Sequence, residues 1–151
     1  MARSRKSNGE ESRVTEIFDV GDGEIPSPSE YCSLRAASGL SPMTASVAEG
    51  ALPRSLHAVT VRERGVLVAM GRVVGDGLHV QVVDMAVRPD YQGKGLSRIV
   101  MERIMAFIDS SVAPCAVVSL LADVDWLYHK FGFEETQAST AMVYRGHRKL
   151  G

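Results

Sequence analysis

The chain has 151 residues, of which 45% are hydrophobic and 23% charged, and its formal net charge is −1. This length predicts one domain, and the composition is that of a globular protein rather than a disordered or membrane-spanning one. A net charge near zero provides no broad positive field, so we expect neither a nucleic acid nor a membrane surface as a partner.

The segment from Met1 to Ser12 is polar and basic, and it contains no apolar run of the kind that a secretory signal needs. We interpret residues 1–12 as a disordered tail ahead of a single domain over residues 13–151. Cys32 and Cys115 lie far apart in the sequence and form no metal-binding spacing. Two free thiols are typical of a reducing compartment, and we therefore expect a cytoplasmic protein.

The first third of the chain gives only weak local signals. Residues 13–19 alternate weakly between polar and apolar and favour a first strand, and a Gly-Asp-Gly turn follows at residues 21–23. Helices are predicted over residues 31–37 and 44–51. The stretch over residues 38–53 is rich in small residues, so we expect it to be mobile or to take its shape from the elements beneath it.

Three strand patterns follow with short connections, over residues 56–62, 66–74 and 78–87, which predicts an antiparallel meander. A Gly-Asp-Gly sequence at residues 75–77 is a strong hairpin signal. In the third strand the apolar side chains change from even to odd positions near Val82 and Val83. A phase slip of one residue is typical of a β-bulge, although a strand that is apolar on both faces is the alternative.

The rest of the chain predicts a parallel crossover and a short final unit. Apolar residues at helical spacing predict a helix over residues 96–108, and residues 116–121 form a buried strand pattern. The unit over residues 78–121 is therefore a right-handed strand–helix–strand crossover. A short helix is expected over residues 123–131, and a last strand over residues 142–145. The predicted fold class is mixed α/β.

The turn between the third strand and the long helix is the most informative motif. Its sequence, Gln92-Gly93-Lys94-Gly95-Leu96-Ser97, leaves backbone N–H groups unpaired at the positive end of a helix, which suits a phosphate group. It does not fit a P-loop, and the third glycine of the dinucleotide fingerprint would fall at Arg98. A plain strand-to-helix turn is the alternative to an anion site.

This motif resembles the acyl-CoA signature of the GNAT superfamily of N-acetyltransferases, which is Arg or Gln, two residues, Gly, any residue, and Gly or Ala. Asp84-Met85-Ala86-Val87-Arg88-Pro89 is similar to the lead-in strand of the family, and residues 127–133 are similar to its second landmark. The match covers roughly residues 57–133, with Ser97 as a departure at the last signature position. The resemblance implies a mixed, mostly antiparallel sheet of about six or seven strands, splayed between two parallel central strands and flanked by about four helices.

The resemblance also implies acetyl-CoA as the co-substrate, with no metal. The pyrophosphate would lie on backbone N–H groups from Gly93 to Ser97, braced by Gln92, and the pantetheine arm would pair with the splayed third strand. The cleft would open between the strands over residues 78–87 and 116–121. The implied cofactor-binding residues are Met85, Ala86, Val87, Gln92, Gly93, Lys94, Gly95, Leu96, Ser97, Arg98 and Tyr128.

For catalysis, the resemblance assigns Tyr128 as the proton donor to the departing thiolate, whereas without it the ring would be read as ordinary packing. No general base is obvious. Gln81 lies at the position where relatives carry a base, and it could hold a relay water. Asp84 is ionisable and nearby, and the alternative is a satisfied carboxylate that stabilises the loop.

The expected acceptor is the primary amine of a small molecule, with a protein amine as the second candidate. The substrate pocket would be built mainly from roughly residues 31–53, where few acidic side chains are available for a polycationic acceptor, Glu30 and Glu49 being the main ones. An acyl-CoA-binding sensor without catalysis is an alternative, and a nucleic-acid or partner-binding protein that uses the basic tail is another. We expect a monomer or a homodimer.

Overall fold

The computed structural model describes residue 9, residues 12–15 and residues 17–146. In this part of the chain, five strands form one sheet in the order β1-β2-β3-β4-β5. Neighbouring strands are antiparallel except β4 and β5, which are parallel. The predicted mixed sheet is confirmed, with slightly fewer strands than expected. The strands are β1 at Asp19–Asp22, β2 at His57–Glu63, β3 at Val66–Gly75, β4 at His79–Val87 and β5 at Val117–Leu120.

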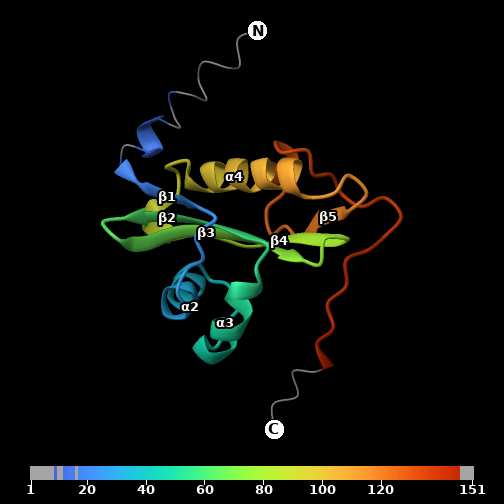
Figure 1. The fold of residues 1–151 in the computed structure, drawn as a ribbon, viewed down its shortest axis with the longest axis horizontal. Coiled ribbons are helices and arrows are strands. Elements are labelled where there is room, and N and C mark those ends of the chain that lie inside the picture. The colour runs from blue at the N-terminus through green and yellow to red at the C-terminus, as the bar shows by residue number, and fades with distance from the viewer. Residues whose placement is uncertain (1–8, 10–11, 16, 147–151) are drawn as a thin grey trace.

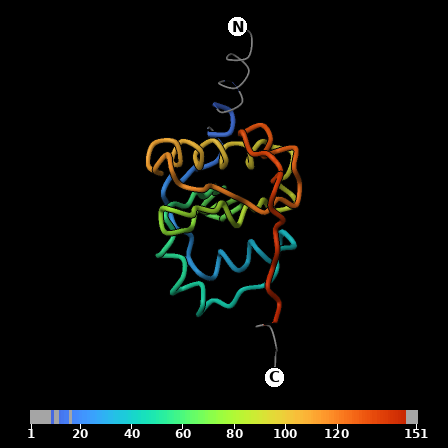
Figure 2. Tube along the Cα trace, turned by 90° about the vertical axis from the view of Figure 1, so that its right-hand side faces the viewer, coloured from blue at the N-terminus to red at the C-terminus, as the bar shows by residue number. Residues whose placement is uncertain are grey.

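Helices cover both faces of the sheet, so that the molecule has three layers (Figures 1 and 2). One face carries α4, Leu96–Ser111, and the other carries α2, Pro28–Ala37, and α3, Ala45–Ala51. Among the described residues no helix has the length and apolar character needed to cross a membrane. The remaining elements are the 3₁₀ turns η1 at Leu52–Arg54 and η2 at Pro89–Tyr91, and the short helix α5 at Trp126–His129.

Each face of the sheet has its own apolar core. The first lies between the sheet and α4, where Val100, Met101 and Ile104 are fully buried against strand residues such as Val59. The second lies between the sheet and the α2–α3 pair, where Leu34 and Leu52 are buried. The helical spacing that predicted the long helix is therefore the spacing of its contacts with the sheet.

The predicted first strand over residues 13–19 is wrong. Residues 12–15 and 17 are helical, and the first strand begins only at Asp19. Val14 and Phe18 are four residues apart, and the N–H of Phe18 donates to the carbonyl of Val14 at 2.8 Å. One helical turn buries both side chains in the first core, which an alternating strand would not do. Most of the tail predicted over residues 1–12 lies outside the described residues.

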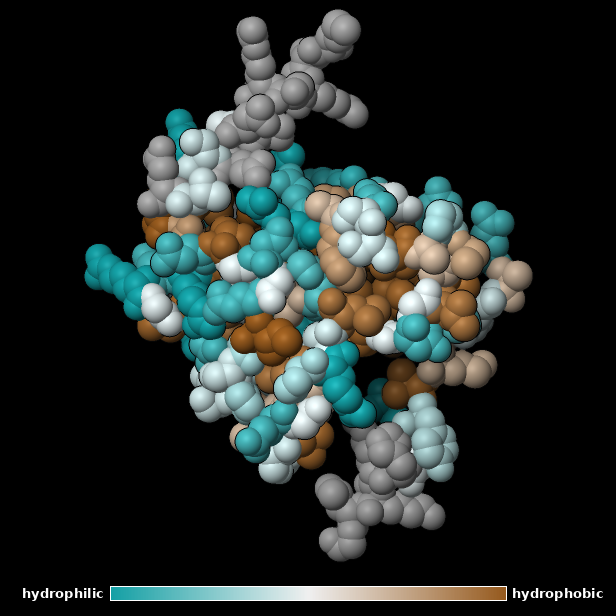
Figure 3. All heavy atoms as spheres, viewed as in Figure 1, coloured by the Kyte–Doolittle hydropathy of each residue, from teal (hydrophilic) through white to brown (hydrophobic). Residues whose placement is uncertain are grey.

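The predicted last strand over residues 142–145 is also absent. These residues lie in no helix or strand, and Met142 is 87% exposed. In the described part of the chain, β5 lies at the edge of the sheet and pairs only with β4. Apolar side chains reach the surface at this end of the molecule, where Val117 and Leu121 are more than half exposed (Figure 3).

The phase slip in the third strand pattern corresponds to a real irregularity. The β3–β4 register runs from Met70 opposite Ala86 to Arg72 opposite Val83, so two residues of β4 face one residue of β3. The extra residue is a β-bulge at Asp84 and Met85, one to two residues beyond the expected place. The parallel pairing of β4 with β5 ends at Val82, just before the bulge, so the residues beyond it have no β5 partner.

Gly71 lies opposite the bulge, and its missing side chain makes room for α4. A Cβ atom at this position would lie 2.5 Å from Sδ of Met85 and 2.8 Å from side-chain atoms of Ile104 and Val100. Contacts this short require the side chains of Met85, Ile104 or Val100 to shift from their packed positions. The glycine therefore allows Met85 to turn toward the first core.

We predict that Gly71→Ala lowers the free energy of unfolding by about 1–3 kcal/mol, the usual cost of overpacking a core. Gly50→Ala is the matched control, because Gly50 lies in α3 and a Cβ atom added there would meet nothing within 4 Å. We expect this control to leave stability unchanged or to raise it by about 0.5–1 kcal/mol. Urea unfolding monitored by circular dichroism measures both, and equal effects of the two substitutions would contradict the packing explanation.

Candidate active site

The turn at residues 92–97 presents an uncapped helix start. Gly93 and Gly95 have positive φ angles of 77° and 80°, which glycine adopts without strain. Among the described residues, the backbone N–H groups of Gly93, Lys94 and Gly95 donate to no protein acceptor, and no side chain caps α4. These N–H groups lie at the positive end of a helix of 16 residues and can therefore bind an anion.

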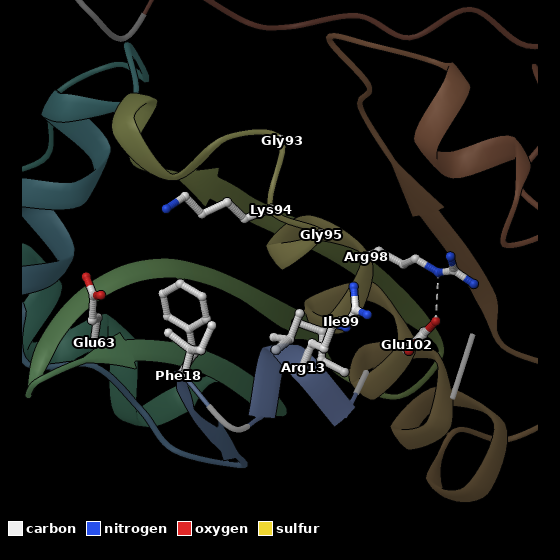
Figure 4. A pocket seen from close by; sticks show the side chains of 11 residues that line it. Arg13, Phe18, Glu63, Gly93, Lys94, Gly95, Arg98, Ile99 and Glu102 are labelled. Carbon is white, nitrogen blue, oxygen red and sulfur yellow. Dashed lines mark hydrogen bonds and ion pairs between the residues drawn. The ribbon is translucent and has the colours of Figure 1, made fainter. Parts of the chain in front are cut away.

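A cavity of about 450 Å³ lies beside this turn (Figure 4). Gly93, Lys94 and Gly95 form one wall, and residues of the first helical turn, including Arg13 and Val14, form another. The floor is apolar, with Phe18 and Ile99 among the lining side chains. The site therefore offers backbone donors and an apolar surface next to one another, which suits a ligand with phosphate and organic parts.

The two basic side chains of the motif are partly engaged by the protein itself. Lys94 lies over the ring of Tyr91, with Nζ 5.4 Å from the ring centroid. The hydroxyl of Tyr91 donates to Glu63, and this bond is the main cause that raises the pKa of Tyr91. Nε of Arg98 lies 3.0 Å from a carboxylate oxygen of Glu102. The backbone N–H groups are consequently the most direct anion donors of the turn.

The bulge places Met85, Ala86 and Val87 beyond the end of the β4–β5 pairing. Ala86 packs in the second core, whereas Met85 and Val87 pack against the first, so the side chains alternate normally after the bulge. Ala86 and Val87 pair with β3 on one side, Met85 lies in the bulge, and no β5 residue is paired with any of the three. The free edge is suited to an extended amide chain that adds to the sheet.

Asp84 lies at the centre of a polar cluster that the sequence did not reveal. One carboxylate oxygen accepts from the guanidinium of Arg35, and the other accepts from Nε of Arg72 at 2.7 Å and from the hydroxyl of Tyr31 at 2.9 Å. The Arg35, Arg72 and Asp84 side chains are only 7%, 11% and 7% exposed. Burial and the neighbouring Asp84 raise the pKa of Tyr31, so the phenol remains a donor.

This cluster holds Asp84 in a conformation that is unusual for a residue with a side chain. Its φ angle is 57°, in the left-handed region, which aspartate enters more readily than most residues. Both carboxylate oxygens already accept hydrogen bonds from Arg35, Arg72 and Tyr31. The geometry therefore fits a residue that fixes the bulge better than one that takes a proton from a substrate.

The other two predicted catalytic residues lie on β4 and α5. Gln81 pairs with Val74 on β3 and with Ser119 on β5, and it is half-buried just before the bulge. Tyr128 is half-buried, and its ring meets Phe133 edge-to-face at 6.4 Å. Burial is the main cause that raises the pKa of Tyr128, which keeps its hydroxyl protonated.

A small polar group near α5 is distinct from these residues. Asp125, His129 and Glu135 bring one potential ligand atom each within 4.8 Å of one another, and all three residues are exposed. Nε2 of His129 lies 2.8 Å from a carboxylate oxygen of Glu135. The contact is an ordinary surface ion pair, and we assign no metal to it.

Glu30, one of the two carboxylates expected near an acceptor, is already committed elsewhere. It caps α2 by accepting from the backbone N–H of Ser27 at 2.6 Å, and it forms a two-bond ion pair with Arg62. Hydrogen bonding to Arg62 is the main cause that lowers the pKa of Glu30 to about 2. The side chain is thus a structural anion and not a free contact for an amine.

Comparisons with known proteins agree with this geometry. The family described as an acetyltransferase (GNAT) domain matches residues 54–135. A probable acetyltransferase of unknown function from methicillin-resistant Staphylococcus aureus is 40% identical, with a TM-score of 0.79 over 85% of this chain and 98% of that one. A GNAT family acetyltransferase from Streptococcus pneumoniae is 25% identical, with a TM-score of 0.70 over 86% and 98% of the two chains.

A more distant structure shares the fold alone. It is a predicted acetyltransferase with acetyl-CoA from Clostridium acetobutylicum, 14% identical, with a TM-score of 0.66 over 84% of this chain and 96% of that chain. Among curated proteins, no sequence matches this chain.

We predict that Gly95→Glu abolishes measurable binding of coenzyme A. The new carboxylate would stand among the N–H groups of the turn and repel phosphate, and the φ angle of 80° would strain a residue with a side chain. Gly77→Glu is the matched control, because Gly77 also has a positive φ and open space around it but lies in the β3–β4 hairpin. Calorimetric titration measures the affinity of both variants for coenzyme A. Retained affinity in the Gly95 variant would contradict the assignment of the turn as a phosphate site.

We also predict that Asp84→Asn lowers turnover of acetyl-CoA less than about tenfold. Asparagine tolerates the left-handed conformation and keeps one oxygen that accepts hydrogen bonds, but its NH2 group cannot accept from the remaining donors and its side chain cannot take up a proton. Loss of a general base would instead cost on the order of 100-fold or more. A loss of that size in a variant with an unchanged melting temperature would assign the base to Asp84.

Proposed function

The chain belongs to the GNAT acetyltransferases, and we propose that it transfers the acetyl group of acetyl-CoA directly to the primary amine of a small molecule. The single observation that carries this proposal is the uncapped, glycine-containing start of α4 next to the free edge of β4. The first feature suits a diphosphate, and the second suits the amide chain that joins the diphosphate to the thioester.

The residues at the glycine turn before α4 and at the free edge of β4 both fit coenzyme A. The N–H groups of Gly93, Lys94 and Gly95 would hold the pyrophosphate, with Leu96, Ser97 and Arg98 in the first turn of α4 beside them. Gln92 would support the turn from its N-terminal side. The backbone of Met85, Ala86 and Val87 would hold the pantetheine amides.

When bound, acetyl-CoA supplies a thioester, which is an activated acyl group. The backbone N–H of Met85, re-aimed by the bulge, is our candidate donor to the carbonyl oxygen. The hydroxyl of Tyr128 is our candidate proton donor to the sulfur, and its raised pKa keeps that proton in place at neutral pH. Gln81 could position a water molecule that removes the proton of the amine, and Asp84 would support the reaction by fixing the bulge.

A screen of amines separates this function from its alternatives. The purified chain is incubated with acetyl-CoA and a panel of small amines, peptides and proteins, and free thiol release and product masses are recorded. Acetylation of small amines supports the proposal, and acetylation of peptide N-termini alone would make the acceptor a protein. Tight coenzyme A binding without any acetylated product would favour a sensor module.

We predict that Tyr128→Phe lowers kcat by about 100-fold, the typical effect of removing a general acid, while the affinity for coenzyme A stays within about twofold. The ring contact with Phe133 is retained by phenylalanine, so the fold should not change. Steady-state kinetics and calorimetry measure the two quantities. Unaltered kcat would remove Tyr128 from the mechanism, and a matched loss of coenzyme A affinity would make it a binding residue only.

A further inference from the structure

The cluster around Asp84 carries more positive than negative charge. Two guanidinium groups, from Arg35 and Arg72, face one carboxylate, while Tyr31 stays neutral because its pKa is raised. The rings and charges are close-packed, since both guanidinium carbons lie within 6 Å of the Tyr31 ring centroid. The formal charge of the cluster is therefore +1, in a partly buried place where water screens it weakly.

Arg35 and Arg72 differ in what they have left to bind. Arg35 donates from Nε and Nη2 to the backbone carbonyl of Ser41 and from Nη1 to Asp84, so all its nitrogens are used. Arg72 donates from Nε to Asp84 and from Nη1 to the hydroxyl of Ser55 at 2.7 Å. In the described residues, Nη2 of Arg72 has no protein acceptor. Nη2 of Arg72 is therefore the donor of this positively charged cluster that can bind a ligand.

Arg72 lies on the face of the sheet where the proposed acceptor must react. Alternation along β4 puts Val80 and Val82 in the core under α4, so Gln81 points to the opposite face. Arg72 shares this face, because its partners Tyr31 and Ser55 come from α2 and from the end of η1. Arg72 also contacts Asp84, the residue next to the proposed N–H donor of Met85.

We infer that the acceptor amine carries an anionic group, a carboxylate as in an amino acid, and that Arg72 binds this group. The inference rests on the proposed acetyl transfer and names its substrate class. A plain ammonium ion would be repelled by the net positive cluster, and the hydrogen bonds of Glu30 go to Arg62 and the α2 cap rather than to this cluster. A zwitterion brings its own counter-charge, and a guanidinium with a free donor is the group that binds carboxylates best.

The positive cluster also accounts for the lack of an obvious general base. A positive charge near an ammonium ion favours its neutral form, which is the form that attacks a thioester. Asp84, whose carboxylate is held by Arg35 and Arg72, is then needed to fix these charges rather than to remove a proton. Arg72 would bind the carboxylate of the acceptor, and the amine of the acceptor would then lie toward the bulge.

The test uses the whole chain with acetyl-CoA and matched acceptor pairs at pH 8. The pairs are glycine and glycinamide, leucine and leucinamide, phenylalanine and phenylalaninamide, and lysine and lysinamide. The amine of each amide loses its proton more easily, as α-amino groups next to an amide do, with a pKa of about 7.7–8.0. Chemistry alone therefore favours the amides. We expect kcat/KM to be at least about tenfold higher for the acid of the preferred pair, as a charge-assisted contact would give.

Substitution of Arg72 tests the residue itself. We expect Arg72→Gln to lower the acid-to-amide ratio of kcat/KM about tenfold, and Arg72→Lys to lower it less, because lysine keeps the charge but not the paired donors. The ratio does not depend on the folded fraction of the variant. Arg62→Gln is the control, since it also removes a guanidinium bound to a carboxylate but lies beside Glu24 and Glu30. An unchanged ratio in the Arg72 variants, or an equal fall in the control, overturns the assignment.

The possible failures are distinguishable. If every amide is a better acceptor than its acid, the inference about the carboxylate is wrong, whereas the acetyltransferase function stands. If no amine of either kind releases thiol from acetyl-CoA and coenzyme A still binds, the proposed function fails together with the inference.

Discussion

The site depends on one carboxylate held in a left-handed backbone conformation. Asp84 has a φ angle of 57°, and its side chain is bonded by two arginines and a tyrosine from two different elements. A left-handed residue with a side chain is unfavourable by roughly 1–2 kcal/mol unless its surroundings hold it there. These hydrogen bonds provide that hold, and the bulge they maintain decides where β4 leaves β5. The free strand edge and the re-aimed Met85 backbone both follow from it.

The bulge is supported from the other face of the sheet by packing rather than by charge. Met85 turns toward α4 and occupies the space that a side chain at Gly71 would fill. Val100 and Ile104 close the same space from the helix. Polar bonds on one face and apolar contacts on the other thus fix one irregularity of the strand. Since α4 also begins at the glycine turn, the position of that turn relative to the bulge is set by the same helix.

The local parts of this arrangement could be predicted from the sequence, and the long-range parts could not. The helix over residues 96–108, the glycine turn before it and the phase slip near Val83 are encoded by neighbouring residues, and the structure contains all three. The partners of Asp84 lie 12, 49 and 53 residues away, and no spacing rule links them. The prediction of an N-terminal strand was wrong because Val14 and Phe18 also fit one helical turn. Only their burial in the folded core distinguishes the helical turn from the strand.

In the proposed function and the proposed acceptor class, the two ends of the site bind negative charge by different means, and this difference has consequences for specificity. At the start of α4, backbone N–H groups act while Lys94 and Arg98 are partly engaged by Tyr91 and Glu102. Backbone groups are present whatever the side chains are, so this end suits a co-substrate shared by many related enzymes. At the bulge, the positive charge belongs to side chains from α2 and β3, which can change without moving the backbone of the turn. Acceptor choice is therefore the property that this architecture leaves free to vary.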